Sequence, residues 1–173
     1  MRQNGLAMIE LSLASPLNDS LDSRAARLLA LVKPLIDRPA IVDALSAAPQ
    51  IWLQPAIRDI HHDHVLFTGD AITGLIDFGA MQVDTPLADV ARLVGSLVGD
   101  DSETRRFALD AYSQIRPLSD ADCHLVDVLD ESGLVIGALN WLVWLYGERR
   151  DMGPIAPISR RLDELLMRLQ TRA

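Results

Sequence analysis

Residues 59–79 have the sequence DIHHDHVLFTGDAITGLIDFG, which is more informative about the fold than any other part of the chain. Two short runs rich in β-forming residues, 65–67 and 72–76, flank a Gly-Asp turn, and this pattern predicts an antiparallel hairpin. Asp59 stands in a loop before the hairpin, and Asp77 follows 18 residues later, just ahead of a Phe-Gly pair. A single hairpin is long enough to bring both carboxylates to the same edge.

The segment resembles the catalytic part of the aminoglycoside phosphotransferase and choline kinase-like family. That family usually reads His-Gly-Asp, four residues, Asn, an apolar strand, a Gly-Asp turn, a second strand, Asp-Phe-Gly and then Asp-Leu-Ala. The matching positions here are Ile57-Arg58-Asp59, His64, Phe67-Thr68-Gly69-Asp70, Asp77-Phe78-Gly79 and Asp89-Val90-Ala91. Ile57 and Arg58 replace His-Gly, and His64 replaces the Asn.

The resemblance implies a phosphotransferase that moves the γ-phosphate of ATP to a hydroxyl group of a small molecule, with Mg²⁺ as cofactor. It implies that Asp59 orients the substrate hydroxyl or accepts its proton. Asp77 would bind Mg²⁺, which prefers hard oxygen donors, and His64 would stand at a second metal-ligand position. Asp89 would support the site through hydrogen bonds to the backbone of the catalytic loop. The identity of the acceptor does not follow from the sequence.

Each of these residues also has an ordinary structural explanation. Loop aspartates such as Asp59 often cap turns, and Asp77 could equally be a strand-end aspartate. An imidazole suits zinc, copper or iron better than magnesium, so His64 either completes a magnesium site poorly or supports the loop. Asp89 would complement the helix dipole in the first turn of a helix.

A glycine-rich turn and a strand lysine, which contact the phosphates in kinases of this kind, are expected in a small β-rich lobe ahead of the catalytic lobe. The one lysine before residue 59 is Lys33, which lies in a helical pattern, and the one glycine is Gly5. We therefore expect residues 1–173 to form one catalytic lobe without its nucleotide-binding lobe, with residues 1–22 as a lead-in segment. The expected interaction partner of this catalytic lobe is then a missing N-terminal nucleotide-binding lobe or another protein chain.

Apolar periodicity predicts helices over most of the remaining chain. The expected fold class is mainly α (α+β): the helical C-terminal lobe of a kinase-like fold, with one small antiparallel hairpin at the site and no N-terminal β-rich lobe. The first predicted helices cover residues 23–36 and 39–47, a run from Pro86 to Val98 capped by Thr85, and residues 102–115. A long apolar helix is predicted from a Ser119-x-x-Asp122 capping box toward Tyr146. A final amphipathic helix after Pro157 is predicted to have on its inner face Ile158, Leu162, Leu165, Leu166 and Leu169.

Composition narrows the classes of function. Asp and Glu outnumber Lys and Arg by 24 to 16, and a net charge of -8 argues against sequence-independent binding of nucleic acid. Cys123 is the single cysteine, so no intramolecular disulfide forms, which fits a reducing cytoplasm. The most apolar run, residues 133–147, is shorter than the about 20 residues that span a bilayer. We therefore expect a cytoplasmic protein that binds neither nucleic acid nor membrane.

Two other interpretations stay open. Asp59-x-His61-x-Asp63-His64 also resembles the His-x-His-x-Asp-His metal cluster of metallo-β-lactamase-fold hydrolases, with Asp for the first His. Against this, a strand follows here instead of the usual glycine and helix, and His124 is the one histidine outside the segment. Alternatively, a catalytic lobe without a nucleotide lobe could be a pseudokinase fragment or an interaction module.

Overall fold

The computed structural model describes residues 15–36, 40–47 and 51–172. The chain folds into two compact units. The first, here called the helical unit, comprises residues 1–38 and 134–173, and the second, the hairpin unit, comprises residues 39–133. Whether these two units together form the single lobe expected for the whole chain stays a prediction.

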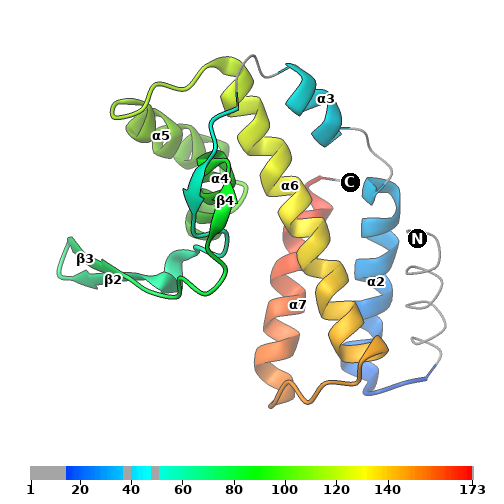
Figure 1. The fold of residues 1–173 in the computed structure, drawn as a ribbon. Helices are drawn as coiled ribbons and strands as arrows, with labels where there is room; N and C mark the ends of the chain where they lie inside the picture. Colours follow the sequence, from blue (N-terminus) through cyan, green and yellow to red (C-terminus); the bar gives the residue numbers. More distant parts are fainter. Residues whose placement is uncertain (1–14, 37–39, 48–50, 173) are drawn as a thin grey trace. The chain divides into compact units, whose positions relative to one another are not determined.

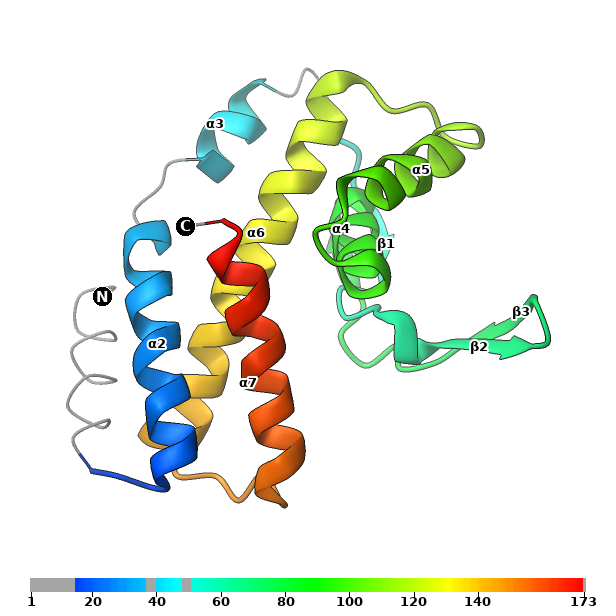
Figure 2. The same cartoon turned by 180° about the vertical axis from the view of Figure 1, so that it is seen from behind.

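Among the described residues of the helical unit, three helical segments share one apolar core. Helices α2 (Asp19–Ile36) and α7 (Ile155–Gln170) lie side by side, as both views show (Figures 1 and 2). The end of α6 (Asp120–Leu142) and the π-helical turn η2 (Val143–Gly147) supply the rest of the core. Helix α2 begins earlier than predicted and continues past Pro34.

The amphipathic pattern of the last helix is confirmed by its buried face. All five residues predicted to face inward are at most 5% exposed. Burial of a leucine or isoleucine side chain contributes about 1.5–3 kcal/mol relative to its exposure, so this face stabilises the unit substantially. The buried residues are Ile158, Leu162, Leu165, Leu166 and Leu169.

The hairpin unit holds the segment that the sequence singles out. Its two antiparallel sheets have two strands each, β1 with β4 and β2 with β3. Within the described residues no larger sheet is present, and the mainly helical α+β class is confirmed. The elements are α3 (Ala40–Ala47), β1 (Gln54–Ala56), η1 (His62–His64), β2 (Val65–Thr68), β3 (Ala71–Leu75), β4 (Gln82–Asp84), α4 (Pro86–Val98), α5 (Ser102–Ser113) and the start of α6.

The predicted hairpin is confirmed as β2 and β3. Thr68 pairs with Ala71, so the turn has two central residues, Gly69 and Asp70. Gly69 has a φ of 59°, and the first central position of a type II′ turn requires such a positive φ, which glycine adopts without a steric penalty. Strand β3 ends at Leu75, and the amide of Ile76 donates a hydrogen bond to the carbonyl of His64 (3.0 Å), so Asp77 leaves the hairpin beside the loop.

The predicted starts of α4 and α6 are also confirmed. Thr85 caps α4 by accepting a hydrogen bond from the amide of Leu87 (3.4 Å), and Pro86 occupies the first helical position. At α6, Asp122 accepts from the Ser119 amide (2.9 Å), and the Ser119 hydroxyl accepts from the Asp122 amide (3.2 Å). This reciprocal pair is a capping box.

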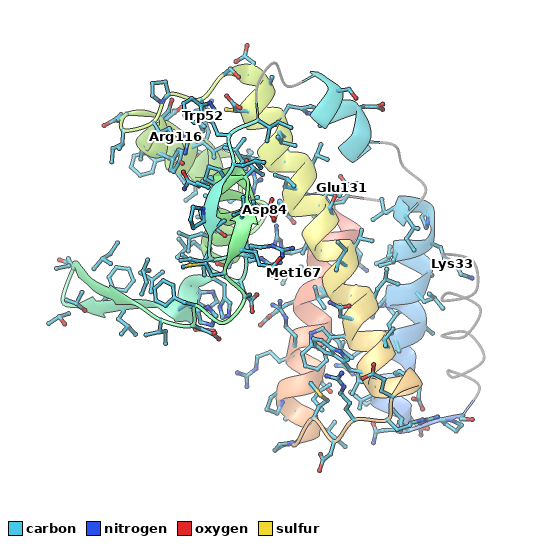
Figure 3. The ribbon with its side chains drawn as sticks, in the orientation of Figure 1. Lys33, Trp52, Asp84, Arg116, Glu131 and Met167 are labelled. Atoms are coloured by element: carbon cyan, nitrogen blue, oxygen red, sulfur yellow. The ribbon has the colours of Figure 1, made fainter. Side chains whose placement is uncertain are left out.

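Strand β1 and the segment before it are held by long-range contacts that the sequence did not indicate. The guanidinium of Arg116 lies 5.3 Å from the ring centroid of Trp52, beside it in Figure 3, and donates to Gln54 (3.3 Å). Pairing of β1 with β4 then brings the chain to the loop at Asp59.

Residues Asp120–Gly147 form one continuous helical stretch that, by length and composition, could cross a membrane. Core helices of soluble proteins meet the same criteria. Here Leu125 and Val126 are buried in the core of the hairpin unit, and Leu142 and Tyr146 in that of the helical unit.

Candidate active site

Helix α4 holds the loop that carries Asp59. Both carboxylate oxygens of Asp89 accept backbone hydrogen bonds, from the amide of Ile57 at 2.8 Å and from that of Arg58 at 2.7 Å. These distances are typical of strong hydrogen bonds to a charged acceptor. Ile60, which is 6% exposed, anchors the same loop in the apolar interior. The backbone on both sides of Asp59 is therefore fixed.

Two further side chains of α4 contact the loop. Arg92 forms an ion pair with Asp59, with 3.1 Å between its guanidinium nitrogen and Oδ1. The hydroxyl of Ser96 accepts a hydrogen bond from the amide of His62 at 2.9 Å. Asp89, Arg92 and Ser96 are spaced i, i+3 and i+7, so they share one helix face. Sequence reasoning missed the last two, although this spacing after Asp89 was a usable signal.

Arg58 adopts a conformation that favours glycine. Its φ is 65°, in the left-handed region, where a residue with a side chain costs about 1–2 kcal/mol. The side chain turns toward β4, where it pairs with Asp84 (3.0 Å) and donates to Gln82 (2.9 Å) (Figure 3 labels Asp84). This backbone explains why a Gly suits the middle position of the His-Gly-Asp pattern.

Two histidine rings lie close together at η1, just before the hairpin. The ring centroids of His61 and His64 are 3.7 Å apart, and the His64 side chain is 13% exposed. Nε2 of His64 lies 3.8 Å from Oδ2 of Asp77, while its Nδ1 is buried without a hydrogen-bond partner. Asp77 itself has a φ of 62°, which aspartate tolerates better than most residues.

Burial lowers the pKa of His61 below its ordinary value, and the neighbouring His64 lowers it further. The charges of Asp63 and Asp59 act in the opposite direction on this pKa. Asp59 lies two residues before His61 in the same loop, and Asp77 lies 3.8 Å from His64.

The arrangement offers one position for a divalent metal at the end of the hairpin. A cation held about 2.0–2.1 Å from each ligand can bridge atoms up to about 4.2 Å apart, so Asp77 and His64, at 3.8 Å, are spaced to share one. A second group of candidate ligands comprises His61, His62 and Asp63, whose ligand atoms lie within 4.8 Å of one another. This group does not include Asp59 or His64, which the hydrolase alternative required as ligands.

Comparisons with known proteins agree with the resemblance seen in the sequence. The model of a family described as the phosphotransferase enzyme family matches residues 10–120. Homoserine kinase from Janthinobacterium sp. (strain Marseille) is 34% identical over 130 residues, which are 70% of this chain and 39% of that protein. The chain thus spans well under half the length of this relative. No solved structure shows a significant match.

The close pair of histidines generates a prediction about pH. His61 should titrate below 6.5, its ordinary value, because burial and His64 disfavour the imidazolium. The unfolded chain then binds more protons than the folded one between the folded pKa and 6.5, so stability falls as pH drops through this window and is restored above it. An NMR titration of the histidine Hε1 resonances measures this pKa directly.

The control is His64→Ala, which removes the neighbouring ring and should raise the pKa of His61 toward its ordinary value. The resonance is assigned with His61→Gln. A His61 that titrates at or above 6.5 would contradict the described burial of this ring beside His64.

Proposed function

Because the chain belongs to the phosphotransferase enzyme family, we propose that it transfers the γ-phosphate of ATP to a hydroxyl group of a small molecule. The observation that carries the proposal is the placement of two carboxylates at the hairpin: Asp59 lies in the preceding loop, which α4 holds, and Asp77 follows the hairpin, 3.8 Å from His64. Phosphoryl transfer needs little covalent chemistry from the protein, so positioning of this kind is its main demand.

Asp59 orients the attacking hydroxyl in this proposal. Its carboxylate is about half exposed, and Arg92 engages Oδ1, which leaves Oδ2 to accept the hydrogen bond of a substrate hydroxyl. Arg92 thus serves as a positioning residue that fixes the plane of the carboxylate. The loop backbone, held by Asp89, prevents Asp59 from drifting away from the position of the phosphate.

Asp77 is the proposed ligand of Mg²⁺. A magnesium ion is usually bound by one or two carboxylates together with phosphate oxygens and water, and it neutralises charge on the transferred phosphate. His64 lies close enough to share the ion, but an imidazole nitrogen is a weaker partner for magnesium than an oxygen. We therefore propose that His64 contributes less than Asp77 to the binding of Mg²⁺.

Homoserine is the first acceptor to test, since the matched relative is a homoserine kinase. It carries the primary hydroxyl that the proposed reaction requires. We also propose that the protein works in the cytoplasm, where ATP and magnesium are available.

The hairpin surface supports a proposed partner. A two-stranded hairpin is at best marginally stable alone, and exposed apolar patches usually mark an interaction surface. We propose that a nucleotide-binding lobe or a partner chain covers this surface. The exposed apolar residues on or beside the hairpin are Leu66, Phe67, Ile72, Leu75, Ile76 and Phe78.

The same surface favours a second candidate function, in which the chain is a non-catalytic interaction module. The two candidates differ in their demands on Asp59 and Asp77, because an interaction module needs neither carboxylate for binding.

Substitution of the two aspartates tests the catalytic proposal. Asp59→Asn should reduce phosphate transfer to homoserine by at least about a hundredfold, as expected for a lost positioning or base group, while Mg–ATP binding is kept. Asp77→Ala should weaken Mg–ATP binding at least about tenfold, because it removes the main metal ligand. Transfer is measured with γ-labelled ATP and binding by calorimetry.

Asp70→Asn is the matched control, since Asp70 is exposed in the hairpin turn and lies outside the proposed site. It should leave both quantities unchanged. Turnover by Asp59→Asn equal to that of the wild type would reject the assigned role of this residue.

The proposed partner lobe has its own consequence. The chain by itself should bind Mg–ATP more weakly than micromolar, because the phosphate contacts of a nucleotide lobe are not supplied by the described residues. Calorimetry with the wild-type chain measures this affinity. A micromolar affinity that requires Asp77 would argue against both the missing lobe and the non-catalytic module.

A further inference from the structure

We propose that His61, His62 and Asp63 bind a transition-metal dication, Zn²⁺ in the first instance, at a position separate from the magnesium ligand Asp77. Each side chain offers one ligand atom, and the three atoms lie within 4.8 Å of one another. Nε2 of His62 is 3.2 Å from Oδ1 of Asp63, and Nδ1 of His61 is 3.7 Å from Oδ2. This proposal does not depend on the proposed phosphotransfer.

Two of the separations approach those of tetrahedral coordination. Ligands about 2.0–2.1 Å from a zinc ion stand about 3.4 Å apart along the edges of a tetrahedron. The separations of 3.2 and 3.7 Å lie on either side of that value, although they end on different oxygens of Asp63, and the three candidate ligand atoms lie within 4.8 Å of one another. Rotation of the exposed His62 and Asp63 side chains would bring the three donors onto one ion, and a water molecule would fill the fourth position.

The donor set selects the metal. Two imidazole nitrogens and one carboxylate suit zinc, nickel or copper, whereas magnesium prefers an all-oxygen shell. The side chain of His62 is 53% exposed and that of Asp63 is 71% exposed, so an ion can enter the site and keep part of its hydration.

Neighbouring residues fix the positions of the proposed zinc ligands. The ring of His61 packs at a tilt against that of His64, and the backbone amide of His62 donates a hydrogen bond to the hydroxyl of Ser96 in α4. Supporting contacts of this kind orient metal-binding side chains and raise affinity. The three ligands are consecutive in the chain, and η1 already bends the segment, so little further loop-closure entropy is lost on binding.

Zinc titration of the purified full chain tests this inference. We expect one zinc ion per chain by calorimetry and by competition with a chromophoric chelator, with shifts of the His61 and His62 ring resonances. His62→Ala should weaken zinc binding at least tenfold, and Asp63→Asn should weaken it in the same direction. His124→Ala, a change at the exposed histidine of α6, should leave the affinity unchanged.

Several outcomes would overturn the inference. Zinc affinity that is unchanged in His62→Ala and Asp63→Asn means that these ligands do not bind it. Loss of binding in His64→Ala with retention in His62→Ala would place the zinc beside Asp77 instead. Complete displacement of zinc by millimolar Mg²⁺ would show a site without nitrogen ligands. Far-UV circular dichroism shows whether each variant is folded. If either His62→Ala or Asp63→Asn is unfolded, the zinc affinity of the other variant decides the result.

Discussion

The carboxylate of Asp89 and its two backbone hydrogen bonds are the constraint on which the site depends. The left-handed backbone of Arg58 costs about 1–2 kcal/mol, while each hydrogen bond to a charged acceptor contributes about 1.5–3 kcal/mol. The hydrogen bonds therefore outweigh the strain, and the loop stays in a conformation that its own sequence disfavours. Without Asp89, the position of Asp59 would no longer be defined by the fold.

Helix α4 extends this constraint to the rest of the site. Arg92 and Ser96, on the same face as Asp89, contact Asp59 and the backbone of His62. The N-terminal cap at Thr85 fixes where α4 begins, and thus where this face points. The departure from the family pattern at His64 adds a ring that lies against His61 and next to Asp77. The loop thereby becomes rich in nitrogen ligands, which is the chemical basis for proposing a zinc site beside the proposed magnesium ligand.

Local patterns were sufficient to predict the hairpin, the caps of α4 and α6, and the inner face of α7, because each depends on residues close in sequence. Pairing of β1 with β4 was missed, since strands of three residues carry no periodicity and their partners are far apart. The ion pair between Asp59 and Arg92 joins a loop to a helix 33 residues away, and charge alone did not select it among the arginines. The catalytic and metal-binding roles of Asp59, Asp77 and His64 came from a resemblance and remain predictions.

Amide hydrogen exchange at Ile57 and Arg58 tests the central claim most directly. In Asp89→Ala both amides should exchange at least about tenfold faster than in the wild type, because each loses a hydrogen bond of about 1.5–3 kcal/mol. The amide of buried Val94 in α4 should keep its protection, and Asp110→Ala, at an exposed aspartate of α5, should change neither loop amide. Unaltered exchange of Ile57 and Arg58 in Asp89→Ala would show that α4 does not hold the loop.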